Sequence, residues 1–229
     1  MITIPGAEPA DAVPRTGAPA GPLELLQRPV QLQGSALARG LLRLAGWQVP
    51  FDGLPAAQGV VVVYPHTSNW DFVVGLLAKW SIGIPATFWG KDTLFRIPLF
   101  GRWLRWLGGV PVQRDAPRGQ VGQMVDALRT AREQGRFMWL ALAPEGTRRR
   151  TEGWRTGFHR VATQAGVPVA LVVLDYPRRR VTFDSSWRLS GDLQADFAVF
   201  AQRFASGCGF HRDQAAPVRP LSTSNGTRT

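Results

Sequence analysis

Polar residues with catalytic potential follow two apolar runs of the kind that forms buried strands. The segment HTSNWD at residues 66–71 follows the apolar run at 60–64, and the segment PEGTR at 144–148 follows the run at 137–143. In α/β proteins, ligands bind where strands end and loops lead into helices. If the two strands are parallel neighbours, a histidine and a carboxylate from the first segment face a glutamate and an arginine from the second across one crevice.

The first segment suits general base catalysis. The imidazole of His66 can take a proton from a hydroxyl near neutral pH. A carboxylate from Asp71 on the other ring nitrogen would fix the tautomer and stabilise the imidazolium that forms. The two positions are roughly 140° apart around a helix, so the pair requires His66 in the turn and Asp71 in the first helical turn. On the spacing alone, the simpler interpretation is a loop histidine and an aspartate that interacts with the helix dipole.

The second segment suits an anion. Gly146 allows a ligand to approach the backbone closely, and the guanidinium of Arg148 offers a planar pair of donors to a phosphate. The alternative is a tight turn whose arginines, Arg149 and Arg150 among them, are solvated.

A third stretch lies between these segments, and the order of all the blocks is specific. GKDTLFRIPLFG at 90–101 and GVPVQR at 109–114 follow the H-x-x-x-x-D block, and VPV at 167–169 follows PEGTR. This series resembles the glycerophospholipid acyltransferase family, which includes 1-acyl-sn-glycerol-3-phosphate acyltransferases, over about residues 55–175.

The resemblance implies acyl transfer from a thioester, either acyl-CoA or acyl carrier protein, to the free hydroxyl of a lysolipid. The leading candidate for this acceptor is lysophosphatidic acid. It makes His66 the general base and Asp71 its orienting partner. The residues it implies for binding the acceptor and its phosphate are Glu145, Gly146, Thr147, Arg148, Lys91 and Arg114. It implies no metal and no bound cofactor, since the thioester supplies the activation.

The identity of the acceptor stays open, because the residues on either side of PEGTR differ from those that are common in the family. Ala143 and Arg149 stand where Phe and Ser are usual. One alternative is the same chemistry on another lysolipid or on a non-phosphorylated amphiphile. A remoter alternative is a non-catalytic basic protein that binds nucleic acid or an anionic membrane. No aromatic–basic strand signature or helix-turn-helix pattern supports nucleic acid as a partner.

Composition agrees with an anionic partner. The 229 residues carry 27 Lys+Arg against 16 Asp+Glu, a net charge of +11, and 45% of them are hydrophobic. A single cysteine excludes a disulfide framework. The sequence lacks a complete phosphate-binding loop, a dinucleotide fingerprint and a G-x-S-x-G elbow. It also lacks the stretch of about 20 apolar residues that a membrane span needs.

Strand-like and helical patterns alternate along the chain. They predict a single α/β domain over residues 25–212, with a largely parallel central sheet flanked by helices. The family resemblance implies that this domain is similar to glycerol-3-phosphate acyltransferases. Disordered tails are expected at 1–24 and 213–229, which are rich in Pro, Ala, Gly, Ser and Thr.

Aromatic and basic residues cluster in the middle of the chain. Trp with Arg suits the headgroups of an anionic bilayer, so we expect a cytoplasmic protein bound peripherally at the cytoplasmic membrane face. The alternative is that these tryptophans belong to the core. The residues concerned are Trp80, Trp89, Trp103, Trp106, Lys79, Lys91, Arg96, Arg102 and Arg105.

Overall fold

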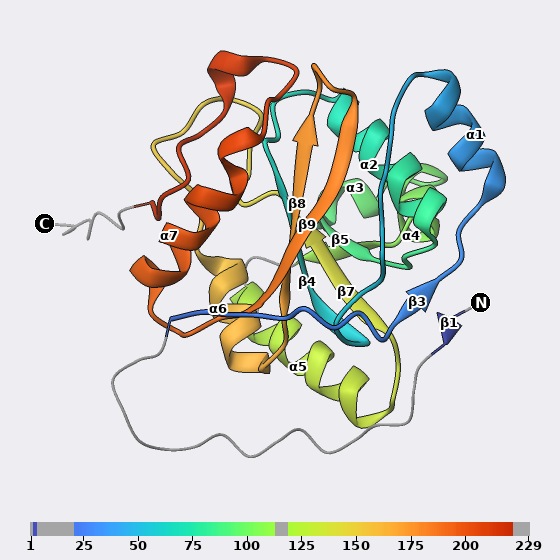
Figure 1. The fold of residues 1–229 in the computed structure, drawn as a ribbon. Coiled ribbons are helices and arrows are strands. Elements are labelled where there is room, and N and C mark those ends of the chain that lie inside the picture. The colour runs from blue at the N-terminus through green and yellow to red at the C-terminus, as the bar shows by residue number, and fades with distance from the viewer. Residues whose placement is uncertain (1, 4–20, 113–118, 222–229) are drawn as a thin grey trace, which may run out of the picture.

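The valine run at 60–63 forms most of strand β4 (Gln58–Tyr64), the central strand of a seven-stranded sheet. The structure is a computed structural model that describes residues 2–3, 21–112 and 119–221. Helices cover both faces of the sheet (Figure 1). The α/β class and the largely parallel sheet predicted from the sequence are therefore confirmed.

Five neighbouring strands of the sheet run parallel, and two antiparallel strands complete one edge. The order across the sheet is β2-β9-β8-β4-β7-β5-β6. The parallel strands are β8 (Val169–Asp175), β4, β7 (Met138–Leu142), β5 (Thr87–Lys91) and β6 (Gly109–Val112). The antiparallel strands are β9 (Arg180–Arg188) and β2 (Leu23–Glu24). A separate pair joins β1 (Ile2–Thr3) to β3 (Gln31–Leu32).

The alternation of side chains along β4 divides the core in two. Val60, Val62 and Tyr64 face one cluster, which includes residues of α5, α6 and α7. Val61 faces the other cluster, which includes residues of α1 and α2. Because both faces of β4 are covered, its sequence is a continuous apolar run.

The helices are α1 (Ala36–Leu44), α2 (Trp70–Ile82), α3 (Asp92–Phe95), α4 (Phe100–Trp106), α5 (Gly119–Glu133), α6 (Gly157–Ala165), α7 (Leu193–Arg203) and the short η1 (Phe204–Ser206) and η2 (Arg212–Gln214).

The packed part of the chain continues beyond residue 212, where the sequence places the start of a tail. Ala216 is fully buried, its N–H donates to Glu145, and its carbonyl accepts from Tyr64 Oη at 2.9 Å. Leu221 N–H donates to the Trp154 carbonyl at 2.8 Å. Backbone hydrogen bonds and a few small apolar residues, Ala215, Ala216 and Val218, hold this segment against the core without a periodic apolar pattern.

The N-terminal boundary also differs slightly, since residues 23–24 pair with β9. Of the two expected tails, residues 1, 4–20 and 222–229 lie outside the described residues.

Candidate active site

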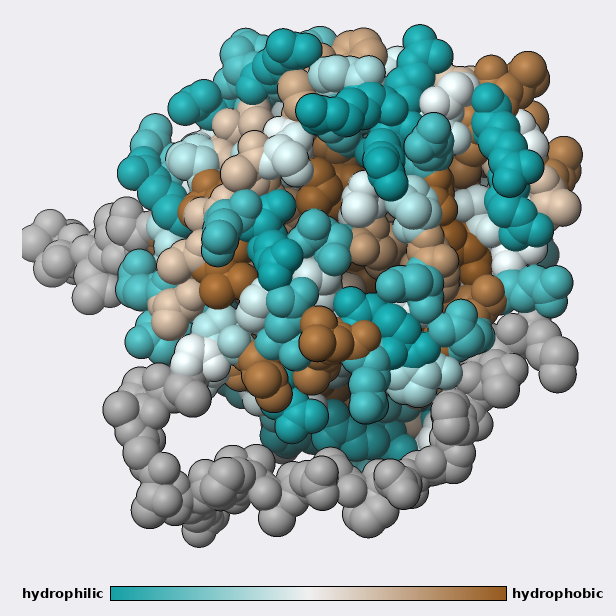
Figure 2. All heavy atoms as spheres, in the orientation of Figure 1, coloured by the Kyte–Doolittle hydropathy of each residue, from teal (hydrophilic) through white to brown (hydrophobic). Residues whose placement is uncertain are grey.

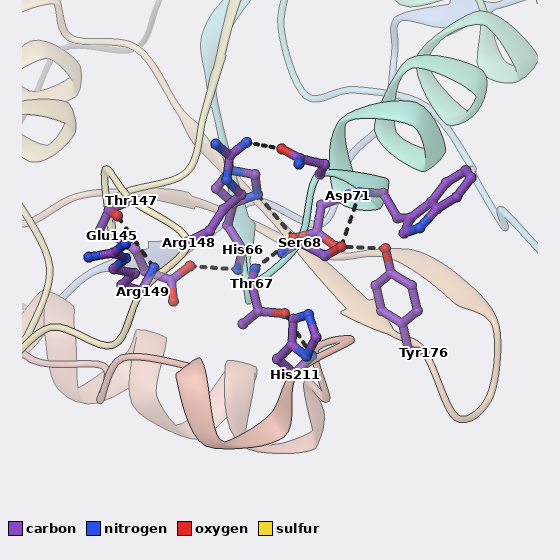
Figure 3. Close-up of polar contacts among 12 residues, drawn as sticks. His66, Thr67, Ser68, Asp71, Glu145, Thr147, Arg148, Arg149, Tyr176 and His211 are labelled. Carbon is purple, nitrogen blue, oxygen red and sulfur yellow. Dashed lines mark hydrogen bonds and ion pairs between the residues drawn. The ribbon is translucent and has the colours of Figure 1, made fainter.

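The two polar segments meet at one edge of the sheet, as their positions after β4 and β7 predict. These strands are parallel neighbours, so their carboxyl ends lie together. The backbone N–H of His66 donates to Glu145 Oε2 at 2.6 Å. Arg148 donates to Asn69 Oδ1. Both contacts join the first segment to the second (Figure 3).

His66 and Asp71 form the predicted pair. The Nδ1 atom of His66 lies 3.1 Å from Asp71 Oδ2, and 25% of the His66 side chain is exposed against 1% for Asp71. Asp71 lies in the first turn of α2 and His66 in the loop before it. Because Asp71 occupies Nδ1, Nε2 is the ring nitrogen left to exchange a proton with a substrate.

Asp71 also organises the loop that carries His66. Its Oδ2 accepts hydrogen bonds from the N–H groups of Thr67 at 2.7 Å and Ser68 at 2.8 Å, and its Oδ1 accepts one from Tyr176 Oη at 2.6 Å. Burial acts to raise the pKa of Asp71, but the hydrogen bonds from His66, Tyr176 and Ser68 outweigh it and hold the pKa below its ordinary value. The carboxylate is therefore ionised where imidazole chemistry operates.

Tyr176 is a site residue that the sequence analysis missed. It directly follows β8, which is parallel to β4 on the side opposite β7. The signal was available, because a third buried-type run ends at residue 174 and its following residues must reach the same edge of the sheet.

Glu145 lies behind the loop that carries His66. Its side chain is almost fully buried and accepts hydrogen bonds from His66 N–H and from Ala216 N–H at 3.1 Å. It is absent from the residues that line the cavity described below. The sequence predicts an acceptor contact for Glu145, whereas the structure places its carboxylate between His66 and the C-terminal segment.

Burial raises the pKa of Glu145 to about 7, which predicts a measurable pH dependence of stability. Because the folded-state pKa exceeds the ordinary value of 4.5, the stabilising contribution of this group is full below pH 4.5 and is lost as the pH rises through about 7. We expect the free energy of unfolding of the wild type, relative to Glu145→Gln, to fall by about 3 kcal/mol between roughly pH 5 and pH 8. Urea titrations across this range measure it.

The control for this prediction is Glu152→Gln, which changes a side chain that is 88% exposed. Its stability relative to the wild type should show little dependence on pH over the same range. A difference between wild type and Glu145→Gln that stays constant with pH would contradict the prediction.

A cavity of about 1170 Å³ opens beside His66 and Asp71, and both residues line it. Thr147 and Arg148 contribute to a polar part of its wall. An apolar part is formed by residues of the sheet and α2, among them Val61, Val63, Phe72, Leu76, Ala86 and Phe88. The cavity can therefore hold an amphiphile with its polar group near His66.

The other predicted binding residues are placed less completely. Gly146 lines the cavity in a turn with φ +67°. Lys91 ends β5, whose carboxyl end lies at the same sheet edge because β5 runs parallel to β7. Arg114 lies outside the described residues. The phosphate contacts of Lys91 and Arg114 stay predictions.

Two features are absent from the part of the chain that the structure describes. No three His, Cys, Asp or Glu side chains there come together in an arrangement that could hold a metal ion. No helix in the same residues is long and apolar enough to cross a bilayer.

The sequence profile of the Acyltransferase family matches residues 49–175, a range that contains both polar segments and β4 through β8. The chain therefore belongs to the acyltransferase family, and the resemblance inferred from its motifs is confirmed at that level.

Similar proteins include lysophosphatidylcholine acyltransferase 1 of Rattus norvegicus, 27% identical over 206 residues, which are 88% of this chain and 37% of the rat protein. Lysophosphatidylcholine acyltransferase 2 of Danio rerio is 29% identical over 129 residues, 56% of this chain and 23% of that protein. The chain thus spans little more than a third of the rat relative's length. A solved structure, the 1-acyl-sn-glycerophosphate acyltransferase PlsC of Thermotoga maritima, is 19% identical with a TM-score of 0.43, covering 63% of this chain and 62% of that one.

Proposed function

We propose that the protein is a lysophospholipid O-acyltransferase, with lysophosphatidic acid as acceptor and acyl-CoA or acyl carrier protein as donor. The observation that carries the proposal is the His66–Asp71 pair, which lines a cavity with both an apolar wall and an arginine. This is the arrangement that deprotonation of a lipid hydroxyl needs. Family membership supports the same reaction class.

The chemistry follows from the geometry of the pair. His66 Nε2 removes the proton from the acceptor hydroxyl as its oxygen attacks the thioester carbonyl carbon. Asp71, ionised and bonded to Nδ1, stabilises the imidazolium. The tetrahedral intermediate then expels the thiolate as the C–S bond breaks, and the imidazolium returns its proton to the sulfur. The products are the ester and the free thiol. We propose that no metal or resident cofactor takes part, because the thioester is already activated.

Arg148 is assigned to the acceptor phosphate, with Lys91 and Arg114 as further partners. Arg148→Gln should raise the KM for lysophosphatidic acid about tenfold or more, because a charge-assisted hydrogen bond is lost. The KM for the thioester should change much less. Steady-state kinetics with each substrate varied in turn measures both constants. Equal effects on the two would remove Arg148 from this role.

The test of the function is a transfer assay with purified protein and labelled acyl-CoA or acyl carrier protein, with products resolved by mass. The acceptors are lysophosphatidic acid, lysophosphatidylcholine and a monoacylglycerol. Preferential acylation of lysophosphatidic acid supports the proposal. Preference for lysophosphatidylcholine, the substrate named in the relatives, would overturn the acceptor but keep the chemistry. No product from any acceptor would overturn the acyltransferase function.

We also propose that the protein works at an anionic membrane surface on the cytoplasmic side. Trp103 and Trp106 of α4 are 45% and 73% exposed, and Trp80 packs half-buried against Trp106. The Trp89 side chain lies outside the described part. The exposed arginines beside them are Arg96, Arg102 and Arg105. Figure 2 shows further hydrophobic residues at the upper right, over α1, whose exposed leucines are Leu37, Leu41 and Leu44. Such a surface suits a bilayer interface.

A further inference from the structure

Two arginines outside the recognised motifs lie on the wall of the catalytic cavity. Arg155 directly precedes the N-cap residue of α6 and Arg160 lies within that helix, and both line the cavity together with Arg148. None of the ion pairs found among the described residues involves any of these three side chains. Asp71, the carboxylate that lines the same cavity, is buried and occupied by its own hydrogen bonds. Among the described residues, the lining therefore carries three guanidinium groups that have no ion-pair partner.

The turn that carries the PEGTR segment holds Arg155 through two contacts. The N–H of Arg155 donates to the Pro144 carbonyl at 2.9 Å. Its side chain lies against Gly146, so closely that a Cβ atom at that residue would be 2.8 Å from Arg155 Nε. Gly146 therefore gives the Arg155 side chain its room within the cavity lining, which also includes Arg148.

The start of α6 adds to the positive potential of this wall. Thr156, at the N-cap position, makes no capping hydrogen bond with its side chain, and Gly157 and Phe158 line the cavity. The first N–H groups of a helix lack partners within the helix and favour anions. Three arginines and the first residues of α6 thus line the same cavity.

We propose that Arg155 and Arg160 form, with Arg148, a phosphate subsite of the cavity. This inference rests on the proposed function, which brings two phosphorylated molecules to His66: the thioester donor and the lysophosphatidic acid acceptor. A guanidinium offers a phosphate paired donors in a fixed plane. The ligand chemistry is a phosphate ester, carried either by the coenzyme A part of the donor or by the headgroup of the acceptor.

The experiment is isothermal titration of Arg155→Gln and Arg160→Gln with coenzyme A in one arm and glycerol 3-phosphate in the other. Each variant should weaken binding of one probe about tenfold or more. Weaker coenzyme A binding with unchanged glycerol 3-phosphate binding assigns the subsite to the donor, and the reverse assigns it to the acceptor. Arg155→Lys keeps the charge but loses the paired donors of the guanidinium. Its affinity for the probe should lie between those of Arg155→Gln and the wild type.

The matched control is Arg149→Gln, which removes the same charge from an exposed neighbour that does not line the cavity. If Arg155→Gln and Arg160→Gln bind both probes as well as Arg149→Gln does, the subsite is overturned. Unchanged melting temperatures ensure that the loss reflects binding and not unfolding. Because titration requires no turnover, a protein that binds these probes but transfers no acyl group would contradict the proposed function without contradicting the subsite.

Discussion

His66→Ala is expected to lower kcat for acyl transfer by a factor of about 10³, within the range that a positioned general base usually contributes. Apart from the imidazole, the groups that contact Asp71 among the described residues are the N–H groups of Thr67 and Ser68 and the Tyr176 hydroxyl, and none of them accepts a proton from the acceptor hydroxyl near neutral pH. The KM values should change little, since the arginines and the apolar wall of the cavity remain. Initial rates with labelled acyl-CoA and lysophosphatidic acid measure the effect.

The matched control is His211→Ala. The His211 side chain is exposed, and the residue contacts the catalytic loop through its backbone N–H, which donates to Thr67 Oγ1 and is kept by the substitution. This variant should retain nearly full activity. Circular dichroism of His66→Ala should match the wild type. Near-full activity of a correctly folded His66→Ala protein would exclude His66 as the base.

The position of the His66–Asp71 pair could be predicted because it depends on strand order alone. β4 and β7 are continuous apolar runs, and each is followed at once by a polar segment. Parallel pairing of such strands must bring the two segments to one edge of the sheet. The distance between His66 and Asp71 then follows from a short loop that leads into α2.

The direction of Glu145 could not be predicted in the same way. Its two hydrogen-bond donors are His66, on another strand end, and Ala216, in a segment that composition assigns to a tail. No pattern of spacing joins residues 145 and 216. A glutamate next to Gly146 and Arg148 suggests a ligand contact, and only the three-dimensional structure shows the carboxylate turned towards the protein backbone.

Gly146 lies at the cavity, as the sequence predicts, but its small size also makes room for a side chain of the protein itself. Its conformational freedom predicts a close approach by a ligand, and it does line the cavity. The structure adds that the group nearest to it is the side chain of Arg155. The sequence contains both residues but does not show that a bend of the chain brings one over the other.

Asp71→Asn is expected to lower kcat by about 10²–10⁴ while the fold is kept. An asparagine can direct its carbonyl oxygen at His66, Thr67 and Ser68 and its amide group at the Tyr176 hydroxyl, which can also accept a hydrogen bond. The loop then keeps its hydrogen bonds, but the negative charge beside the imidazole is gone. The imidazolium formed in the transition state is no longer stabilised, so kcat falls more than either KM changes.

Two further substitutions separate the charge of Asp71 from its structural role. Tyr176→Phe removes one of the hydrogen bonds to Asp71 and leaves the charge, so kcat should fall about tenfold or less. Asp71→Ala also leaves the buried N–H groups of Thr67 and Ser68 without an acceptor, so the melting temperature should drop by several degrees, which Asp71→Asn should avoid. A Tyr176→Phe variant as inactive as Asp71→Asn would show that hydrogen-bond geometry, and not charge, makes Asp71 necessary. The comparison thus decides whether the carboxylate acts on the reaction or only on the loop.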